Sequence, residues 1–410
     1  MKPESISAVG KLMVAFAVAL ALVAVATPRA HAQTFSVVHN FTGGSDGGNP
    51  LGGFTIDAAG NLYGTTDAGG VYGAGTVFKM THSGSEIVLY SFTGGTDGAN
   101  PGASLLMDAA GNLYGTTFAG GAFGAGTVFT VSPYSGKEKV LYSFTGGTDG
   151  AGPEAGLAMD AAGFLYGTTT AGGSHGNGTV FRLGVNGGQW REKVLYSFGQ
   201  LPDGKVPVAG VTLDADGDLY GTTSAGGINN YGIVFRLTRS SAPGWTESSW
   251  RESILHNFQN SSDGAVPYAG LIFDQSGNLY GAATEGGTVP NTGGTIFKLT
   301  PTTSGWTFTV LYSLPGSGIS GTFRNLIMDA SGSLSLYGTT HCDGDNNAGT
   351  VYKLTNSGGA WTYTSLHVFT GGSDGLYSFS NLVFDANGNL FGTTNLGGAH
   401  GSGVVFKITP

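Results

Sequence analysis

The stretch Asp57-Ala-Ala-Gly-Asn-Leu-Tyr-Gly-Thr-Thr66 recurs, with small changes, six more times along this chain of 410 residues. The later copies begin at Asp108, Asp160, Asp214, Asp274, Asp329 and Asp385. Each copy is followed by a Gly-rich stretch, by a run like Gly75-Thr-Val-Phe-Lys-Met80 and then by a run like Val88-Leu-Tyr-Ser-Phe92. A phrase that returns every 51 to 60 residues indicates a repeat architecture built from one supersecondary unit.

Each unit contains four short runs rich in Val, Leu, Tyr, Phe and Thr, bounded by Gly, Asp, Asn or Pro. In the second unit these runs cover residues 104–107, 113–117, 127–131 and 140–144. Such runs joined by short turns predict antiparallel strands, and no later stretch of the chain has a sustained helical period. We therefore predict a four-stranded meander for each unit, which must bury its faces against its neighbours.

The two ends of the chain indicate how the units are arranged. The last unit ends at residues 403–410 after only three runs. The mature chain, by contrast, starts with a run that resembles the fourth run of a unit but has no first three runs before it, Phe35-Ser-Val-Val-His-Asn-Phe41. If that N-terminal run completes the last sheet, the sheets close into a ring with no unpaired edge. We predict an all-β fold, a seven-bladed β-propeller of four-stranded antiparallel blades, as a single domain over residues 33–410.

Two recurring residue types have structural explanations. The Asp that opens each copy can cap its own turn while the following Gly adopts a positive φ. A Gly such as Gly64 or Gly115 lies in the middle of the second strand of its unit. A Gly in a strand predicts a close approach of backbone near the ring axis.

Composition and charge exclude several classes of protein. Gly contributes 75 residues without the three-residue period of collagen, and the 40% hydrophobic content is too high for a disordered polar chain. The formal net charge of −9 leaves no basic footprint, so we expect no nucleic-acid partner. Cys342 is the only cysteine and cannot pair within the chain, so we expect the fold to be stabilised by burial alone. We also expect a monomer.

Residues 1–32 have the pattern of a signal peptide. Lys2 and Lys11 precede or begin an apolar run over residues 12–26, and Ala30-His31-Ala32 is a cleavage site of the small-residue type. The alternative is a retained anchor, but the run falls short of the ~20 residues that span a bilayer. We expect an exported protein, extracellular, cell-surface or periplasmic, with no membrane span after signal removal.

The repeat unit resembles the Gloeo/Verruco-type tandem-repeat family of exported bacterial proteins, which are choice-of-anchor repeat proteins. The match covers residues 35–410, with Ala282-Ala283 in place of Thr-Thr and a longer sixth copy at Ser335-Leu336. The resemblance implies export, often with a separate sorting or anchoring segment, and implies no known reaction. Because Pro410 ends on a repeat strand, we expect this chain to have no such segment.

Loops after the second strand and after the fourth strand of each unit are expected on one face of the propeller, around one mouth of its channel. One position in the Gly-rich loops varies among large polar or aromatic residues: Tyr72, Phe123, His175, Tyr231, Asn291 and His400. Variable tips on a rigid ring form a candidate binding surface, suited to an uncharged ligand such as a glycan. The alternative is that these residues only fill space between blades.

The Asp-Gly pairs after the fourth runs provide a second ring: Asp46, Asp97, Asp149, Asp203, Asp263 and Asp374. These carboxylates could hold a cation or a polar substrate, but capping of their own turns is the simpler explanation. Glycoside hydrolysis needs one defined carboxylate pair, and a quasi-symmetric ring offers none.

Metal and nucleophile signals are weak. Asp214-Ala-Asp-Gly-Asp218 and Asp343-Gly-Asp-Asn-Asn347 alternate oxygen ligands as calcium loops do, but Leu354 stands where such a loop has its Glu. We expect no cofactor, with calcium as the alternative. His341 and Cys342 would point to opposite faces of a strand, so we expect a buried, inert thiol.

The tryptophans fall in the hairpins between the third and fourth strands: Trp190, Trp245, Trp250, Trp306 and Trp361. We expect them to pack across these hairpins, with a partner-binding surface as the alternative.

Taken together, the sequence favours a non-catalytic exported propeller that binds a polysaccharide or protein partner. The alternatives are a carbohydrate-active propeller enzyme, a hydrolase or lyase using acids or His at the channel mouth, and a purely structural envelope component.

Overall fold

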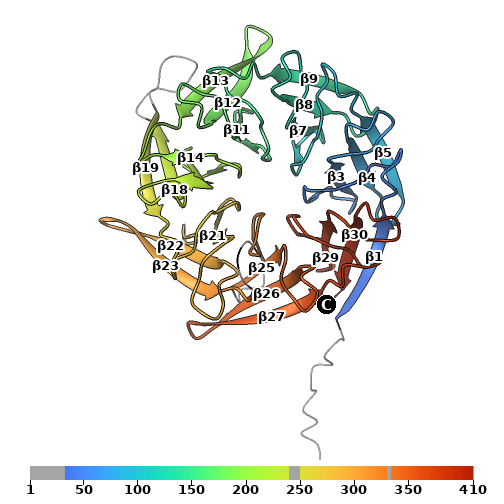
Figure 1. Cartoon of the computed structure of the whole chain (residues 1–410). Coiled ribbons are helices and arrows are strands. Elements are labelled where there is room, and N and C mark those ends of the chain that lie inside the picture. The colour runs from blue at the N-terminus through green and yellow to red at the C-terminus, as the bar shows by residue number, and fades with distance from the viewer. Residues whose placement is uncertain (1–32, 240–249, 317, 319, 330–333, 410) are drawn as a thin grey trace, which may run out of the picture.

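The computed structural model describes residues 33–239, 250–316, 318, 320–329 and 334–409, so the signal-peptide prediction lies outside the described residues. All regular elements of the described chain are β-strands, arranged as blades around a central opening (Figure 1). None of the described residues forms a helix of the length and hydropathy needed to cross a bilayer. The predicted all-β seven-bladed propeller is therefore confirmed.

Each blade is one four-stranded antiparallel sheet, whose strands follow one another from the channel to the outer surface. The first two blades are β2 (Thr55–Ile56), β3 (Leu62–Thr66), β4 (Thr76–Met80), β5 (Glu86–Ser91), and β6 (Leu106–Met107), β7 (Leu113–Thr117), β8 (Thr127–Val131), β9 (Glu138–Ser143). The third and fourth are β10 (Ala158–Met159), β11 (Leu165–Thr169), β12 (Thr179–Asn186), β13 (Gln189–Ser197), and β15 (Thr212–Leu213), β16 (Leu219–Thr223), β18 (Ile233–Arg239), β19 (Trp250–Asn257).

The fifth and sixth blades are β20 (Ile272–Phe273), β21 (Leu279–Ala283), β22 (Thr295–Thr302), β23 (Gly305–Ser313), and β24 (Ile327–Met328), β25 (Ser335–Thr340), β26 (Thr350–Ser357), β27 (Ala360–Val368). The seventh is β28 (Val383–Phe384), β29 (Leu390–Thr394), β30 (Val404–Thr409) and β1 (Thr34–Asn40). A separate pair, β14 (Gly204–Lys205) and β17 (Ala225–Gly226), joins the turn that precedes the fourth blade to a loop of that blade.

The N-terminal strand closes the ring as predicted. β1 pairs antiparallel with β30, from Thr34 opposite Thr409 to Asn40 opposite Val404, and the two strands lie side by side in Figure 1. The Phe41 N–H extends this pairing by donating to the Gly403 carbonyl at 3.0 Å. Every blade therefore has four strands, and the first strand that the structure describes is the last strand of the seventh blade.

The strand bounds differ from the predicted runs at the inner and outer edges of the blades. In the second blade, residues 104 and 105 remain unpaired before β6, and β9 begins at Glu138 rather than at residue 140. The unpaired residues belong to the segment that crosses the channel wall. The predicted first run thus supplies channel lining as well as a strand.

The mid-strand glycines make room for a side chain rather than for neighbouring backbone. A Cβ on Gly115 would lie 2.6 Å from Cζ of Phe129, a residue of the adjacent strand β8. A Cβ on Gly221 would likewise lie 2.5 Å from Cζ of Phe235. The prediction of a close backbone approach at these positions was wrong, because a Phe ring occupies that space in each case.

The core consists of hydrophobic clusters between successive blades. In one cluster, Tyr63 and Phe92 of the first blade pack against Leu113 and Phe129 of the second blade. The rings of Phe92 and Phe129 meet edge to face with centroids 5.0 Å apart. Burial of such rings is worth ~1.5–3 kcal/mol each, so adjacent blades hold each other in place.

Candidate functional site

The six residues predicted as binding tips lie in the loops between the second and third strands of their blades. Tyr72 and Phe123 are 63% and 64% exposed, and His175 and His400 are also exposed. Tyr231 and Asn291 are half-buried, and Tyr231 packs against the cluster that contains Phe258. The tips therefore differ in accessibility from blade to blade.

These loops lie over the outermost strands rather than over the channel. The Ala122 N–H donates to Oγ of Ser143, the last residue of β9, at 3.3 Å. In the seventh blade the Ala399 N–H donates to Oδ1 of Asn40, the last residue of β1, at 2.8 Å. The structure thus distributes the six predicted residues around the outer rim, one to a blade, and does not bring them together in one pocket.

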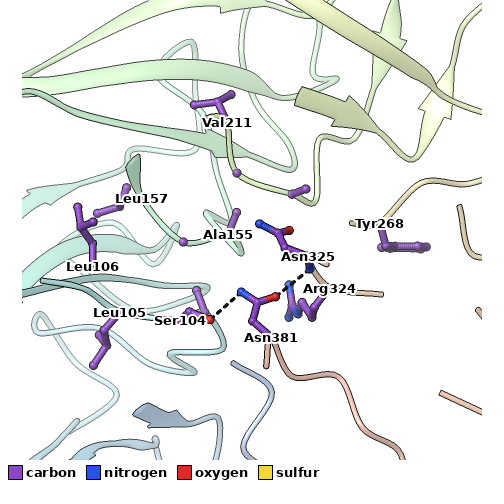
Figure 2. A pocket seen from close by; sticks show the side chains of 14 residues that line it. Ser104, Leu105, Leu106, Ala155, Leu157, Val211, Tyr268, Arg324, Asn325 and Asn381 are labelled. Atoms are coloured by element: carbon purple, nitrogen blue, oxygen red, sulfur yellow. Dashed lines mark hydrogen bonds between the residues drawn. The ribbon is translucent and has the colours of Figure 1, made fainter. Parts of the chain in front are cut away.

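The central channel contains a cavity of about 170 Å³ whose lining comes from six blades (Figure 2). The innermost strands have only two residues each, and the residues that precede them form the wall. Figure 2 shows Ser104, Ala155 and Val211 on the segments of the second to fourth blades, together with Arg324 and Asn381 from the sixth and seventh.

A belt of hydrogen bonds crosses one side of this cavity. The Asn381 amide donates to Oγ of Ser104 at 3.1 Å, and the Asn325 N–H donates to Oδ1 of Asn381 at 2.8 Å (Figure 2). Asn381 can reach Ser104, two blades away, because Gly53 of the intervening blade has no side chain: a Cβ there would lie 2.6 Å from Cβ of Asn381. We call Ser104, Asn325 and Asn381 the channel belt.

Arg324 lies beside the channel belt and lines the same cavity. Its buried Nε makes no hydrogen bond within the described chain. Burial lowers the pKa of Arg324, and the negative charge of Glu154 opposes that decrease. The guanidinium is thus a cation within the channel, with hydrogen-bonding capacity left over.

Aromatic side chains form one wall of the channel mouth, which we call the aromatic wall: Tyr268, Phe323, His341, Tyr377 and Phe379. The ring centroid of Phe323 lies 5.1 Å from that of Tyr268 and 5.2 Å from those of His341 and Phe379. The ring of His341 lies 4.4 Å from Tyr377 and 4.2 Å from Phe379. Burial lowers the pKa of His341 to about 4, so its imidazole is neutral at pH 7.

The first and third blades each supply one acidic group to the mouth. Asp67 and Glu154 line a cavity of about 200 Å³ together with Phe118 and Asn100. Burial raises the pKa of Asp67, partly offset by contact with Asn100, and the charge of Glu154 raises it further. Glu154 also contributes to the raised pKa of Tyr268, after burial. The channel mouth is therefore strongly asymmetric, with carboxylates in one part and aromatic rings in another.

The aspartates of the Asp-Gly turns are turn caps. Asp97 accepts hydrogen bonds from the Thr93 N–H at 2.8 Å, from the Thr93 hydroxyl at 2.5 Å and from the Tyr90 hydroxyl at 2.9 Å. Asp149 repeats this pattern with Thr145 and Tyr142. Across the described residues, no group of three or more His, Cys, Asp or Glu side chains is placed to hold a metal ion.

The two turns considered for calcium use their carboxylates internally. Asp214 accepts hydrogen bonds from the Asp216 and Asp218 N–H groups at 3.0 and 2.9 Å, and Asp218 forms an ion pair with Arg236 at 2.5 Å. Asp343 is buried and accepts a hydrogen bond from the Thr340 hydroxyl. These oxygens are directed to protein donors.

His341 and Cys342 follow β25 in a loop, so the strand alternation assumed for them does not apply. Cys342 is partly rather than fully buried, and burial together with Asp343 raises the pKa of its thiol. A raised thiol pKa disfavours the reactive thiolate. His341 instead belongs to the aromatic wall.

The described tryptophans pack against the core as expected. Trp250 is buried in one cluster, and Trp190, Trp306 and Trp361 pack against three others. Trp245 lies outside the described residues.

The sequence reasoning missed the residues of the channel mouth, although a signal for them exists. Five units have a Pro shortly before the innermost strand, and the last two have Thr322 and Ser378 in its place. The residue that follows varies from unit to unit: Leu51, Gly102, Glu154, Val208, Tyr268, Phe323 and Phe379. The position after Gly-Thr-Thr varies similarly and includes Asp67, Phe118 and His341. The criterion that selected the loop tips, variation on a constant scaffold, would also have selected these two positions.

Comparisons with known proteins agree with the repeat and the fold. A family model described as the Gloeobacter/Verrucomicrobia repeat matches residues 27–235 and 213–410. No curated protein matches the chain.

Two solved structures share the architecture at low sequence identity. A crystal structure described as a proposed 6-phosphogluconolactonase from Bacteroides uniformis is 15% identical, with a TM-score of 0.53 over 81% of this chain and 88% of that chain. The extracellular domain of a proposed one-component system from B. thetaiotaomicron is 11% identical, with a TM-score of 0.52 over 86% of this chain and 37% of that chain. Likeness at this identity shows the fold alone.

Proposed function

This chain belongs to the Gloeobacter/Verrucomicrobia repeat family, and we propose that it is an exported, non-catalytic module that binds a glycan at its channel mouth. In this proposal the propeller acts as a monomer outside the cytoplasm, and its partner is a polysaccharide. The repeat scaffold holds the blades rigid, and the variable positions at the mouth determine what is bound.

The observation that carries the proposal is the aromatic wall beside convergent polar groups. Phe323, Phe379 and His341 pack against one another within 5.2 Å and form one side of the mouth. Aromatic rings pack well on the apolar C–H faces of sugar rings, while carboxylates and amides accept and donate hydrogen bonds to hydroxyls. Ligand sites of small molecules commonly combine such apolar walls with a few placed polar groups.

The experiment compares the mouth with the outer rim. A panel of neutral oligosaccharides is screened first, and the best binder is then titrated by calorimetry against Phe379→Ala and Phe123→Ala variants. We expect Phe379→Ala to weaken binding by tenfold or more, because a stacked aromatic contributes ~1 kcal/mol or more beyond its area. Phe123→Ala, a loss of an aromatic ring on the rim, should bind as the wild type does.

The opposite result, with binding lost only in Phe123→Ala, would place the ligand on the rim loops instead. Thermal unfolding of both variants serves as the folding control. If no oligosaccharide binds to the wild-type protein, the proposal fails.

A second candidate function is a carbohydrate-active enzyme. Asp67 and Glu154 line one cavity, and burial and the charge of Glu154 raise the pKa of Asp67, as is useful for a general acid. Release of reducing ends from a bound polysaccharide, abolished in Glu154→Gln, would favour this candidate. We expect binding without release.

A further inference from the structure

Arg324 occupies a position that the fold fills with small residues elsewhere. The Thr116 hydroxyl of the second blade donates to the carbonyl of Ala155 at 2.9 Å, and Thr168 and Thr222 make the same bond to Ala209 and Ala269. Aligning the units by their innermost strands places Arg324 at this position in the sixth unit. Alanine is thus sufficient for blade packing, and the arginine needs another explanation.

Arg324 also has no counter-ion within ion-pair distance in the described part of the chain. The ion pairs among the described residues do not include it, and its buried Nε has no hydrogen-bond partner. Glu154 acts on it through its charge, without direct ion-pair contact. Arg324 is partly buried, and a cation withdrawn from water is costly unless it is paired, so this arginine is suited to an anion supplied from outside.

From this arrangement we propose that the channel binds a single carboxylate group against Arg324, so that the glycan held at the mouth carries a uronic acid. This inference rests on the proposed function and names its substrate class. The planar guanidinium matches a carboxylate with two parallel hydrogen bonds, which fixes orientation as well as charge.

The surrounding groups favour a carboxylate over a phosphate monoester by charge, whereas a sulfate ester is a monoanion like a carboxylate and differs from it in its tetrahedral shape. Asp67 and Glu154 line a second cavity, Glu154 acts on Arg324 through its charge, and these negative charges oppose a dianion more strongly than a monoanion. The channel belt beside Arg324 is neutral and consists of Ser104, Asn325 and Asn381, whose amides and hydroxyl can accept or donate to a planar group. A carboxylate on the end of a sugar would enter this cavity while the ring stays near the aromatic wall.

The test compares methyl β-D-glucuronide with methyl β-D-glucoside by calorimetry at pH 7. We expect the wild-type protein to bind the glucuronide at least about tenfold more tightly, in keeping with hydrogen bonds to a charged group. In Arg324→Ala the preference should disappear while glucoside binding remains. This variant restores the alanine of four other units, so the blade should tolerate it. Arg191→Gln, the loss of an exposed arginine on β13, is the matched control and should retain the preference.

Equal binding of the two sugars, or an unchanged preference in Arg324→Ala, would overturn the inference and leave the proposed function standing. Tighter binding of a sulfated glucoside than of the glucuronide would overturn the assignment to a carboxylate. Acetate as the probe tests the channel without any sugar: it should raise the melting temperature of the wild type more than that of Arg324→Ala. If neither sugar binds but acetate still raises the melting temperature of the wild type more than that of Arg324→Ala, the proposed function fails and the carboxylate site remains. If acetate raises both melting temperatures equally, the proposal of a carboxylate site fails as well.

Discussion

At the scale of one residue, a single carboxylate organises each of the repeat turns that the structure describes, as Asp108 shows. Its Oδ1 accepts hydrogen bonds from the N–H groups of Ala110 and Asn112, at 2.9 and 2.8 Å. Its Oδ2 accepts from the Asn112 amide at 2.8 Å and from the Tyr114 hydroxyl at 3.0 Å. Burial alone would raise the pKa of Asp108, but these hydrogen bonds hold it below the usual 3.8.

We predict that Asp108→Asn destabilises the protein by ~1–3 kcal/mol at pH 7, because charged hydrogen bonds are replaced by weaker ones. The folded-state pKa lies below the unfolded one, so the carboxylate contributes stability that is fully present above the unfolded pKa of about 4 and is lost as pH falls through the folded pKa. Urea unfolding should therefore show a smaller difference between variant and wild type at pH 3 than at pH 7. Asp216→Asn, which changes an exposed side chain of another turn, is the control. An equal difference at both pH values would contradict the prediction.

At the scale of secondary-structure elements, the outermost strands carry buried carboxyl groups between blades. The residues that share this register position are Glu86, Glu138, Glu192 and Glu252, each with a buried and unpartnered Oε1. Burial, followed by the charge of Asp97, raises the pKa of Glu138 to about 7. In the fifth and seventh blades the position holds Phe308 and Phe35, whose rings stack on His256 and His367 at 3.6 Å.

The wild type is expected to lose stability as the pH rises through neutral, and we predict that Glu138→Gln makes this loss smaller. The folded pKa of Glu138 lies above the unfolded value, so its protonated form contributes stability that is fully present below pH 4.5 and is lost as pH rises through about 7. The wild type should lose melting temperature between pH 5 and pH 8, and the variant should lose less. Comparing the two proteins cancels the contributions of other titrating groups, including the buried histidines.

Lys139→Gln alters the neighbouring exposed residue of β9 and should follow the wild-type profile. A variant that loses as much melting temperature as the wild type between these pH values would contradict the prediction for Glu138.

At the scale of the whole molecule, one strand pair joins the two ends of the chain. β1 contributes Phe35, which stacks on His367 and lies 5.7 Å from the ring of Phe406, and Val37, which packs on the same cluster. Without β1 the edge of β30 is unpaired and these side chains leave the core.

We predict that a chain beginning at Thr42 loses several kcal/mol of stability, at ~1.5–3 kcal/mol for each large side chain removed from the core. Its thermal unfolding should begin at lower temperature, and the amides of β30 should exchange faster than those of β7. A chain beginning at Thr34 is the control and should behave as the full-length protein does. Equal melting temperatures of the two shortened chains would refute closure as a source of stability.

The sequence was sufficient to predict the number of blades, the order of their strands and the closure of the ring. Each of these depends on local signals: the period of the Asp-x-x-Gly-Asn phrase, the turn chemistry around it, and an orphan run at residues 35–41 that complements a last unit with three runs. Capping by Asp57 and Asp97 was predictable for the same reason, because donor and acceptor lie within seven residues of each other.

The candidate site depends on contacts that no local pattern contains. Glu154 comes from the third blade, Arg324 from the sixth, and the aromatic wall from the fifth to seventh. Whether a variable position lies at the axis or on the rim follows from the way the blades close around the channel. Asn381 reaches Ser104 only because Gly53 leaves its path open. Periodicity and turn chemistry act over a few residues and therefore specify the blade, whereas the asymmetric channel arises from packing between residues of different units, which in the pair Ser104 and Asn381 are 277 positions apart.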